Sequence, residues 1–162
     1  MEANINIADS MSMKTGKGFN DGIYFDVNMH LQLFDSSNKL KEERFIHNAV
    51  TSEGKYGIAD QLLSAPTLAK MGWMGIGTST PTLTLLGAEI ARLPFDSKTR
   101  SLAVVTSVCT FGAGVGTGSI TEAGIFNNVA ANSVDMWCSA SFGVITKGAS
   151  DVLTINWQII LA

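Results

Sequence analysis

The sequence predicts a mainly β protein, an antiparallel β-sandwich or jelly-roll-like barrel with one or two short helices. Residues 25–33 and 153–161 alternate apolar and polar side chains with a period of two, which is typical of half-buried strands. Turns rich in Gly, Asn and Ser separate further apolar runs at the spacing of an all-β fold. Because 162 residues fit one domain, we expect an N-terminal arm over residues 1–21 and a single β-rich domain over residues 22–162.

The N-terminal arm lacks the periodicity of the rest of the chain. It is rich in Met, Ser, Lys, Gly and Asn, and residues 14–18 have a flexible composition. Such an arm is either disordered or laid over a neighbouring subunit, and its composition favours neither. Its first residues lack the basic start and apolar run of a signal peptide, and the chain has no apolar run long enough to span a bilayer. We therefore expect cytoplasmic synthesis and no membrane partner.

The first strand has one apolar face and one polar face. Its predicted core face consists of Phe25, Val27, Met29, Leu31 and Leu33. Residues 35–39 supply turn chemistry, since Asp, Asn and Ser side chains hydrogen-bond their own backbone. Residues 40–50 are then expected to return as the second strand of a hairpin.

The middle of the chain predicts short elements of both kinds. Residues 52–63 carry apolar pairs four apart, Ile58 with Leu62 and Ala59 with Leu63, which favour a short helix ended by Pro66. Residues 71–76 indicate a short buried strand. The spacing of Leu86, Glu89, Ile90 and Arg92 predicts one or two helical turns that stop near Pro94.

Strands return in the last third of the chain. Apolar runs predict strands over residues 101–111, 119–126 and 136–145, with a glycine-rich loop at residues 112–118. The final strand places Trp157 on a fully apolar face. If the φ angles of Gly114 and Gly116 are negative, replacing either glycine with alanine should be mild.

No pattern in the sequence indicates catalytic chemistry or a cofactor. The glycine-rich loop lacks the Lys-Ser/Thr end of a P-loop and does not open a helix, so an inter-strand loop is the better interpretation. The two histidines, His30 and His47, are expected to be exposed or hydrogen-bonded, and no metal-ligand spacing is present. We expect no enzyme activity, no cofactor and no metal site.

Three charged residues and one aromatic residue stand out as structural candidates. Glu89 and Arg92 are close enough in sequence to form an ion pair, and Glu122 lies in a run with few other charges. If buried, Glu122 is expected to accept backbone or hydroxyl hydrogen bonds. Phe126 closes the same apolar run, and a structural role is favoured over catalysis for all of these residues.

The charge content favours assembly over an isolated, poorly charged monomer. Only 15% of residues are charged, against roughly a quarter in ordinary soluble domains, so more of the surface suits burial against partners. A net charge of −3 without basic clusters argues against nucleic-acid binding. Cys109 and Cys138 lie in predicted strands and are expected to be reduced core or interface residues.

Residues 45–160 resemble a family of small structural proteins of tailed double-stranded DNA phages. The most distinctive blocks are Ile120–Phe126 and the Thr-Ile-x-Trp pattern that ends at Trp157. The further segments that carry the resemblance are residues 48–55, 74–78, 86–92, 144–147 and 153–159. The resemblance implies a capsid- or tail-associated virion component and brings no catalytic residues.

Three functions follow from these patterns as expectations. The first is a capsid decoration (cement) or head-fibre-base protein in the virion that binds the major capsid protein or other virion proteins. Such a protein would form a homo-oligomer, for which a trimer would cover an edge strand. The second is a tail fibre adaptor or baseplate protein. The third, a carbohydrate-binding module, would need exposed aromatic side chains, for which Trp73, Trp137 and Trp157 are candidates that are better explained as core or interface residues.

Overall fold

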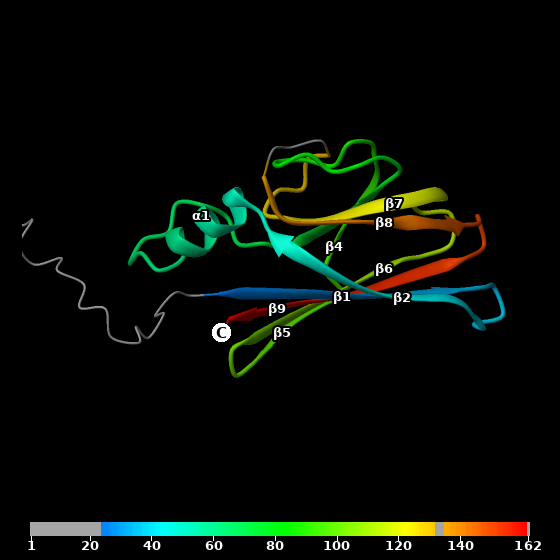
Figure 1. Ribbon diagram of the computed structural model, residues 1–162, viewed down its shortest axis with the longest axis horizontal. Coiled ribbons are helices and arrows are strands. Elements are labelled where there is room, and N and C mark those ends of the chain that lie inside the picture. The colour runs from blue at the N-terminus through cyan, green and yellow to red at the C-terminus, as the bar shows by residue number, and fades with distance from the viewer. Residues whose placement is uncertain (1–23, 132–134, 162) are drawn as a thin grey trace, which may run out of the picture.

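The computed structural model describes residues 24–131 and 135–161 and confirms the prediction of a mainly β fold. The expected arm over residues 1–21 lies outside the described residues. Within the described ranges the chain forms nine strands and one helix (Figure 1). The elements are β1 (Phe25–Phe34), β2 (Leu40–Val50), α1 (Ser52–Asp60), β3 (Trp73–Gly77), β4 (Glu89–Pro94), β5 (Ser97–Ser101), β6 (Val104–Phe111), β7 (Gly118–Phe126), β8 (Met136–Lys147) and β9 (Val152–Leu161).

The nine strands form one antiparallel sheet that curls into a half-barrel, in the order β4-β3-β7-β8-β2-β1-β9-β6-β5. Strand β2 joins two halves of this sheet, one made of β4, β3, β7 and β8 and the other of β1, β9, β6 and β5. It pairs with β1 along most of its length and with β8 only through Ala49 and Val50. The outermost strands β4 and β5 are consecutive in the chain and are joined by residues 95–96. The backbone N–H groups of these linker residues bond to Gly72 and Val108, so the linker contacts both halves.

The core lies between the two halves of the curled sheet. Val27, Met29, Leu31 and Leu33 of β1 are at most 1% exposed, while Phe25 at the strand end is partly buried against them. The neighbouring strand β9 contributes Trp157, which is fully buried. Burial of each large apolar side chain is worth about 1.5–3 kcal/mol, so the two alternating strands provide much of the core's stabilisation.

Helix α1 packs on the sheet through its glycines. Thr51 caps its first turn by accepting a hydrogen bond from the Gly54 N–H at 3.0 Å. A Cβ atom at Gly54 or Gly57 would lie 2.1 Å from atoms of Trp137, so the helix approaches that tryptophan closely. The predicted short helix is confirmed, but it ends at Asp60, so the expected pairing of Ile58 with Leu62 on one helical face is wrong.

The predicted helical pair of Ala59 with Leu63 is also wrong, because Leu63 lies beyond the end of the helix. The helix ends at Asp60, before either leucine, and both Leu62 and Leu63 are exposed. The Asp60 carboxylate instead accepts hydrogen bonds from the backbone N–H groups of Thr67 and Leu68, which fixes the loop after the helix. These bonds lower the pKa of Asp60.

The predicted helical turns around residues 86–92 are wrong, because residues 89–94 form strand β4. Ile76 of β3 pairs with Ala91 and Gly77 pairs with Glu89, so Ile90 is an extra residue that forms a β-bulge. In a regular strand, residues three apart face opposite sides of the sheet. The bulge turns Glu89 to the same side as Arg92, which gives a three-residue spacing that imitates a helix.

The glycine-rich segment is a loop between β6 and β7, as predicted, but two of its glycines have positive φ angles. Gly114 has φ +79° and Gly116 has φ +63°. A Cβ atom at Gly116 would also lie 2.5 Å from Ile76 Cδ1. The condition for a mild alanine substitution is therefore not met, since this backbone region is strained for any residue with a Cβ atom.

Candidate functional site

The buried carboxylate of Glu122 holds the loop between β3 and β4 onto the outer face of the sheet. Glu122 is fully buried and accepts hydrogen bonds from the backbone N–H groups of Ser79, Gly87 and Ala88 at 3.1, 2.8 and 2.8 Å. Its lone pairs are directed at the protein's own backbone, which is what a structural carboxylate needs. This geometry leaves Glu122 in a structural role.

Glu89 and Arg92 form a second structural contact on the same part of the sheet. Arg92 donates to both oxygens of Glu89 at 2.8 and 2.7 Å, and each side chain is 2% exposed. The guanidinium carbon lies 3.5 Å from the centroid of the Phe126 ring, and Arg92 also donates to the Asn128 carbonyl. Four of the residues singled out in the sequence thus lie on β4 and β7, the two strands that flank β3, and contribute packing and hydrogen bonds there.

Lys147 and Asp151 form a buried charge cluster that the sequence analysis did not identify. Lys147 is 1% exposed, and its Nζ donates to the Gly112 carbonyl at 2.8 Å, which anchors the glycine-rich loop. Burial lowers the pKa of Lys147, and the Asp151 carboxylate opposes this shift. Asp151 accepts from Lys41 Nζ at 2.6 Å and from the Gly148 N–H at 2.8 Å, and these bonds lower its pKa.

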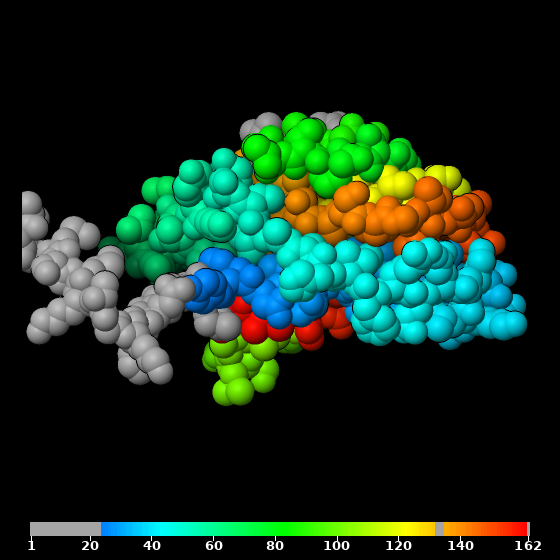
Figure 2. Space-filling view, in the orientation of Figure 1, coloured from blue at the N-terminus to red at the C-terminus, as the bar shows by residue number. Residues whose placement is uncertain are grey.

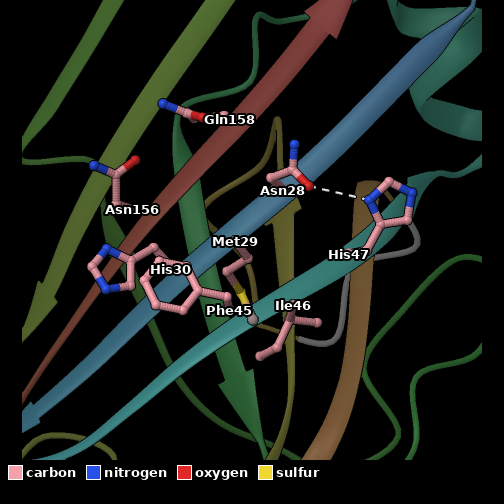
Figure 3. Close-up of a pocket in the computed structure, with 8 residues that line it drawn as sticks. All are labelled: Asn28, Met29, His30, Phe45, Ile46, His47, Asn156 and Gln158. Atoms are coloured by element: carbon pink, nitrogen blue, oxygen red, sulfur yellow. Dashed lines mark hydrogen bonds between the residues drawn. The ribbon is translucent and has the colours of Figure 1, made fainter.

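The outer face of β2, β1 and β9 carries an open groove of about 450 Å³ (Figure 3). We call it the outer groove. The side chains that line it are Asn28, His30, Phe45, His47, Asn156 and Gln158, with Met29 and Ile46 beneath them. Strand pairing fixes this arrangement, because Asn28 lies opposite both His47 and Gln158, and His30 lies opposite both Phe45 and Asn156.

Phe45 is the main apolar surface of the outer groove. Its ring stacks on His30 with centroids 4.3 Å apart and an interplanar angle of 5°, yet the residue is 77% exposed. His30 Nε2 lies 2.7 Å from Glu43 Oε1, and Gln32 donates to the same oxygen at 3.0 Å. These bonds to Glu43, the one from His30 above all, lower the pKa of that carboxyl and hold the stacked pair in place.

A second hollow is lined by residues of α1, β5 and β6. Figure 1 shows that α1 and the β5–β6 hairpin lie toward the same end of the molecule, and the hairpin turn protrudes from the body in Figure 2. We call this end of the molecule the apolar end. The pocket has a volume of about 340 Å³, and its apolar lining consists of Ile58, Met71, Val105 and Trp137. Three cations, Lys70, Lys98 and Arg100, also line it. Large exposed side chains lie in the adjoining helix, loop and hairpin turn: Tyr56 (63% exposed), Leu62 (81%), Leu63 (57%), Leu68 (42%) and Leu102 (88%).

The tryptophans and cysteines are buried or half-buried, and of the tryptophans Trp137 lines the apolar pocket. Trp157 and Trp137 are 0% and 4% exposed, and Trp73 packs partly buried against Leu86, Phe126 and Met136. Burial raises the pKa of Cys109 and of Cys138 to about 12, and both are free thiols. Over the ranges that the structure describes, no group of three or more His, Cys, Asp or Glu side chains is placed to hold a metal ion.

The fold and these surfaces define a curled-sheet β protein with an open polar groove on one face and an apolar end. No family model, curated protein or solved structure matches the chain. Within the described ranges, no helix is both long and apolar enough to cross a bilayer.

Proposed function

We propose that this chain is a non-enzymatic structural protein of a tailed-phage virion, and that it is a capsid decoration or head-fibre-base protein that stabilises the shell. The observation that carries the proposal is the apolar end. A monomer rarely leaves several large apolar side chains exposed around one apolar pocket, whereas assembly surfaces commonly do. The sequence resemblance to phage structural proteins supplies the kind of particle.

The cations beside the apolar pocket define the partner's chemistry. Lys98 Nζ donates to the Met71 carbonyl at 2.7 Å, and Arg100 donates to the Leu102 carbonyl at 2.8 Å, so both side chains are held in place. A partner surface that buries apolar side chains in the pocket and places carboxylates at these cations fits the apolar end. Binding to the assembled lattice would stabilise the shell by mass action.

The backbone of the β5–β6 turn adds to this argument. Leu102 has φ +50°, a conformation that is costly for a branched side chain, and it is 88% exposed. This strained conformation places the apolar side chain of Leu102 in solvent at the tip of the hairpin. Burial of Leu102 against a partner would explain why the turn exposes an apolar side chain at a strained position.

Co-sedimentation tests the proposal. The purified chain is mixed with tail-less mature heads and, separately, with isolated tails from the phage that encodes it. We expect saturable binding to heads at a fixed ratio to the capsid subunit, and the mass of the free chain tests the expected homo-oligomer. The Leu62→Ser, Leu63→Ser double variant should bind at least about tenfold more weakly, because both side chains lose apolar area.

Leu83→Ser is the matched control. Leu83 is 83% exposed but lies on the loop between β3 and β4, away from the apolar end. It should bind heads like the wild type. Binding to tails alone would overturn the head location in favour of a tail fibre adaptor or baseplate role. Equal binding by the wild type, the double variant and Leu83→Ser would show that Leu62 and Leu63 of the apolar end do not contact the partner.

A further inference from the structure

We propose that the outer groove binds a neutral saccharide, by stacking a sugar ring on Phe45 and hydrogen-bonding its hydroxyl groups to the side-chain amides of Asn156 and Gln158 on β9. This inference goes beyond the proposed assembly role and uses a different surface. It rests on three features of the groove: an exposed aromatic ring held in place, side-chain amides with free bonding capacity, and the absence of lining cations.

The aromatic ring is positioned before any ligand arrives. His30 covers one side of Phe45, and Glu43 with Gln32 fixes His30, so the ring gains order without being buried. A sugar presents a face of C–H groups that packs on an aromatic ring, while its hydroxyl groups remain at the edges. A ring held in advance binds such a ligand with less loss of side-chain freedom.

The amides of the groove supply both donors and acceptors. Figure 3 shows Asn156 and Gln158 on β9 beside Asn28 and His30 on β1. Within the part of the chain that the structure describes, neither the Asn156 nor the Gln158 side chain has a hydrogen-bond partner, and both are partly exposed. A side-chain amide donates and accepts at once, which matches a hydroxyl group that does the same.

The charges in and around the groove favour a neutral ligand. Neither lysine nor arginine is among its lining residues, so nothing in the lining carries the fixed positive charge that phosphate groups require. The two nearby carboxylates already face imidazoles: Asp26 lies 3.3 Å from His47 Nδ1, and Glu43 lies 2.7 Å from His30 Nε2. A polyol needs hydrogen-bonding groups and an apolar platform, and the groove provides both.

The experiment is a binding screen of the purified full chain against a panel of oligosaccharides. The panel contains neutral hexose and N-acetylhexosamine oligomers, together with sialylated and phosphorylated ones. Hits are measured by calorimetry and by NMR shifts of the Asn156 and Gln158 side-chain amides. We expect at least one neutral oligosaccharide to bind with a Kd on the order of 1 mM or tighter and to shift these amide signals.

Two groove variants and one control locate the site. Phe45→Ala should weaken binding about tenfold through loss of stacking, and Gln158→Ala should weaken it several-fold. Tyr56→Ala removes an aromatic side chain that is 63% exposed on α1 and should bind like the wild type. Circular dichroism checks that each variant is folded.

Three results would overturn the saccharide site. They are no binding by any neutral member of the panel, equal binding by Phe45→Ala and Tyr56→Ala, and a change in oligomeric mass on Phe45 replacement, which would make the groove a contact between copies. None of these results depends on heads or tails. Failure here is therefore distinguishable from failure of the assembly proposal.

Discussion

At the scale of single residues, Glu122 connects the sheet to the loop that covers it. A buried carboxylate is costly unless its oxygens are bonded, and here the backbone N–H groups of Ser79, Gly87 and Ala88 supply those bonds. The same bonds satisfy backbone groups of a segment that has no strand partner of its own. The same hydrogen bonds thus satisfy both the buried carboxylate of Glu122 and the backbone N–H groups of the loop.

Replacing Glu122 tests this role. Glu122→Ala should lower the free energy of unfolding by about 3 kcal/mol or more, because buried N–H groups lose their acceptor. Glu122→Gln keeps one acceptor oxygen and should cost about 1–2 kcal/mol. Urea unfolding measures both changes. Hydrogen exchange at Gly87 and Ala88 should accelerate in both variants, and unchanged exchange there would show that Glu122 does not hold the loop.

Asp151 provides a pH-dependent contribution to stability. Its pKa is lowered in the folded protein by the hydrogen bonds from Lys41 and from the Gly148 N–H. A lowered folded pKa means that the contribution is present above the unfolded value, near pH 4, and is lost as the pH falls through the folded value. Wild type should therefore be more stable than Asp151→Asn at pH 7.

The difference between wild type and Asp151→Asn should shrink steadily as the pH is lowered below about 4. Urea midpoints measured across this range give the comparison. Asp96→Asn, at an exposed position, is the control and should follow the pH dependence of the wild type. A pH-independent gap between wild type and Asp151→Asn would exclude the ion pair as its source.

At the scale of elements, the strands that the sequence predicts most clearly are those with one apolar face and one polar face. Strands β1 and β9 alternate because one side contacts the core and the other contacts solvent, and the turn at residues 35–39 signals the β1–β2 hairpin. Sequence periodicity reports alternating burial, whereas strands buried on both faces, such as β3 and β7, could be predicted only from their apolar runs.

The elements that the sequence analysis missed lack that alternation. Strand β5 is exposed along its whole length, so it carries no apolar period. Strand β4 contains a bulge at Ile90, which brings Glu89 and Arg92 to one face and makes the spacing resemble a helix. A bulge is a property of strand pairing, and the local pattern of one strand does not show how that strand is aligned with its partner.

The glycine-rich loop supports a graded prediction. Gly112→Ala meets no atom within 4 Å and should change stability by less than about 0.5 kcal/mol. Gly114→Ala adds only the cost of φ +79° and should lose about 1 kcal/mol. Gly116→Ala adds contact with Ile76 and should lose about 2 kcal/mol or more. Urea midpoints in any other order would contradict the described loop backbone.

At the scale of the whole molecule, the two candidate surfaces lie on different parts of one curled sheet. The outer groove is built on β2, β1 and β9, and the apolar end combines α1, β5 and β6. The sequence predicted polar positions on the strands, including His30 and His47. It did not predict that Phe45 is exposed and stacked on His30, because this stack depends on the register between β1 and β2.

The two cysteines test whether the curled sheet unfolds as one unit. Cys109 lies in β6 and Cys138 in β8, on opposite sides of the strand β2 that joins the halves. Because burial raises both thiol pKa values to about 12, neither should react with a thiol reagent at pH 7 in the folded protein. Pulse labelling at increasing urea should give one midpoint for both, whereas two midpoints would indicate two separate units.

If the apolar end is buried on a virion partner, hydrogen–deuterium exchange should detect that burial. Exchange is compared for the free chain and for the chain bound to tail-less heads. We expect protection on binding to be concentrated in residues 56–68 and around Leu102, with exchange in the outer groove strands unchanged. Identical exchange in both states, or protection confined to the outer groove, would contradict it.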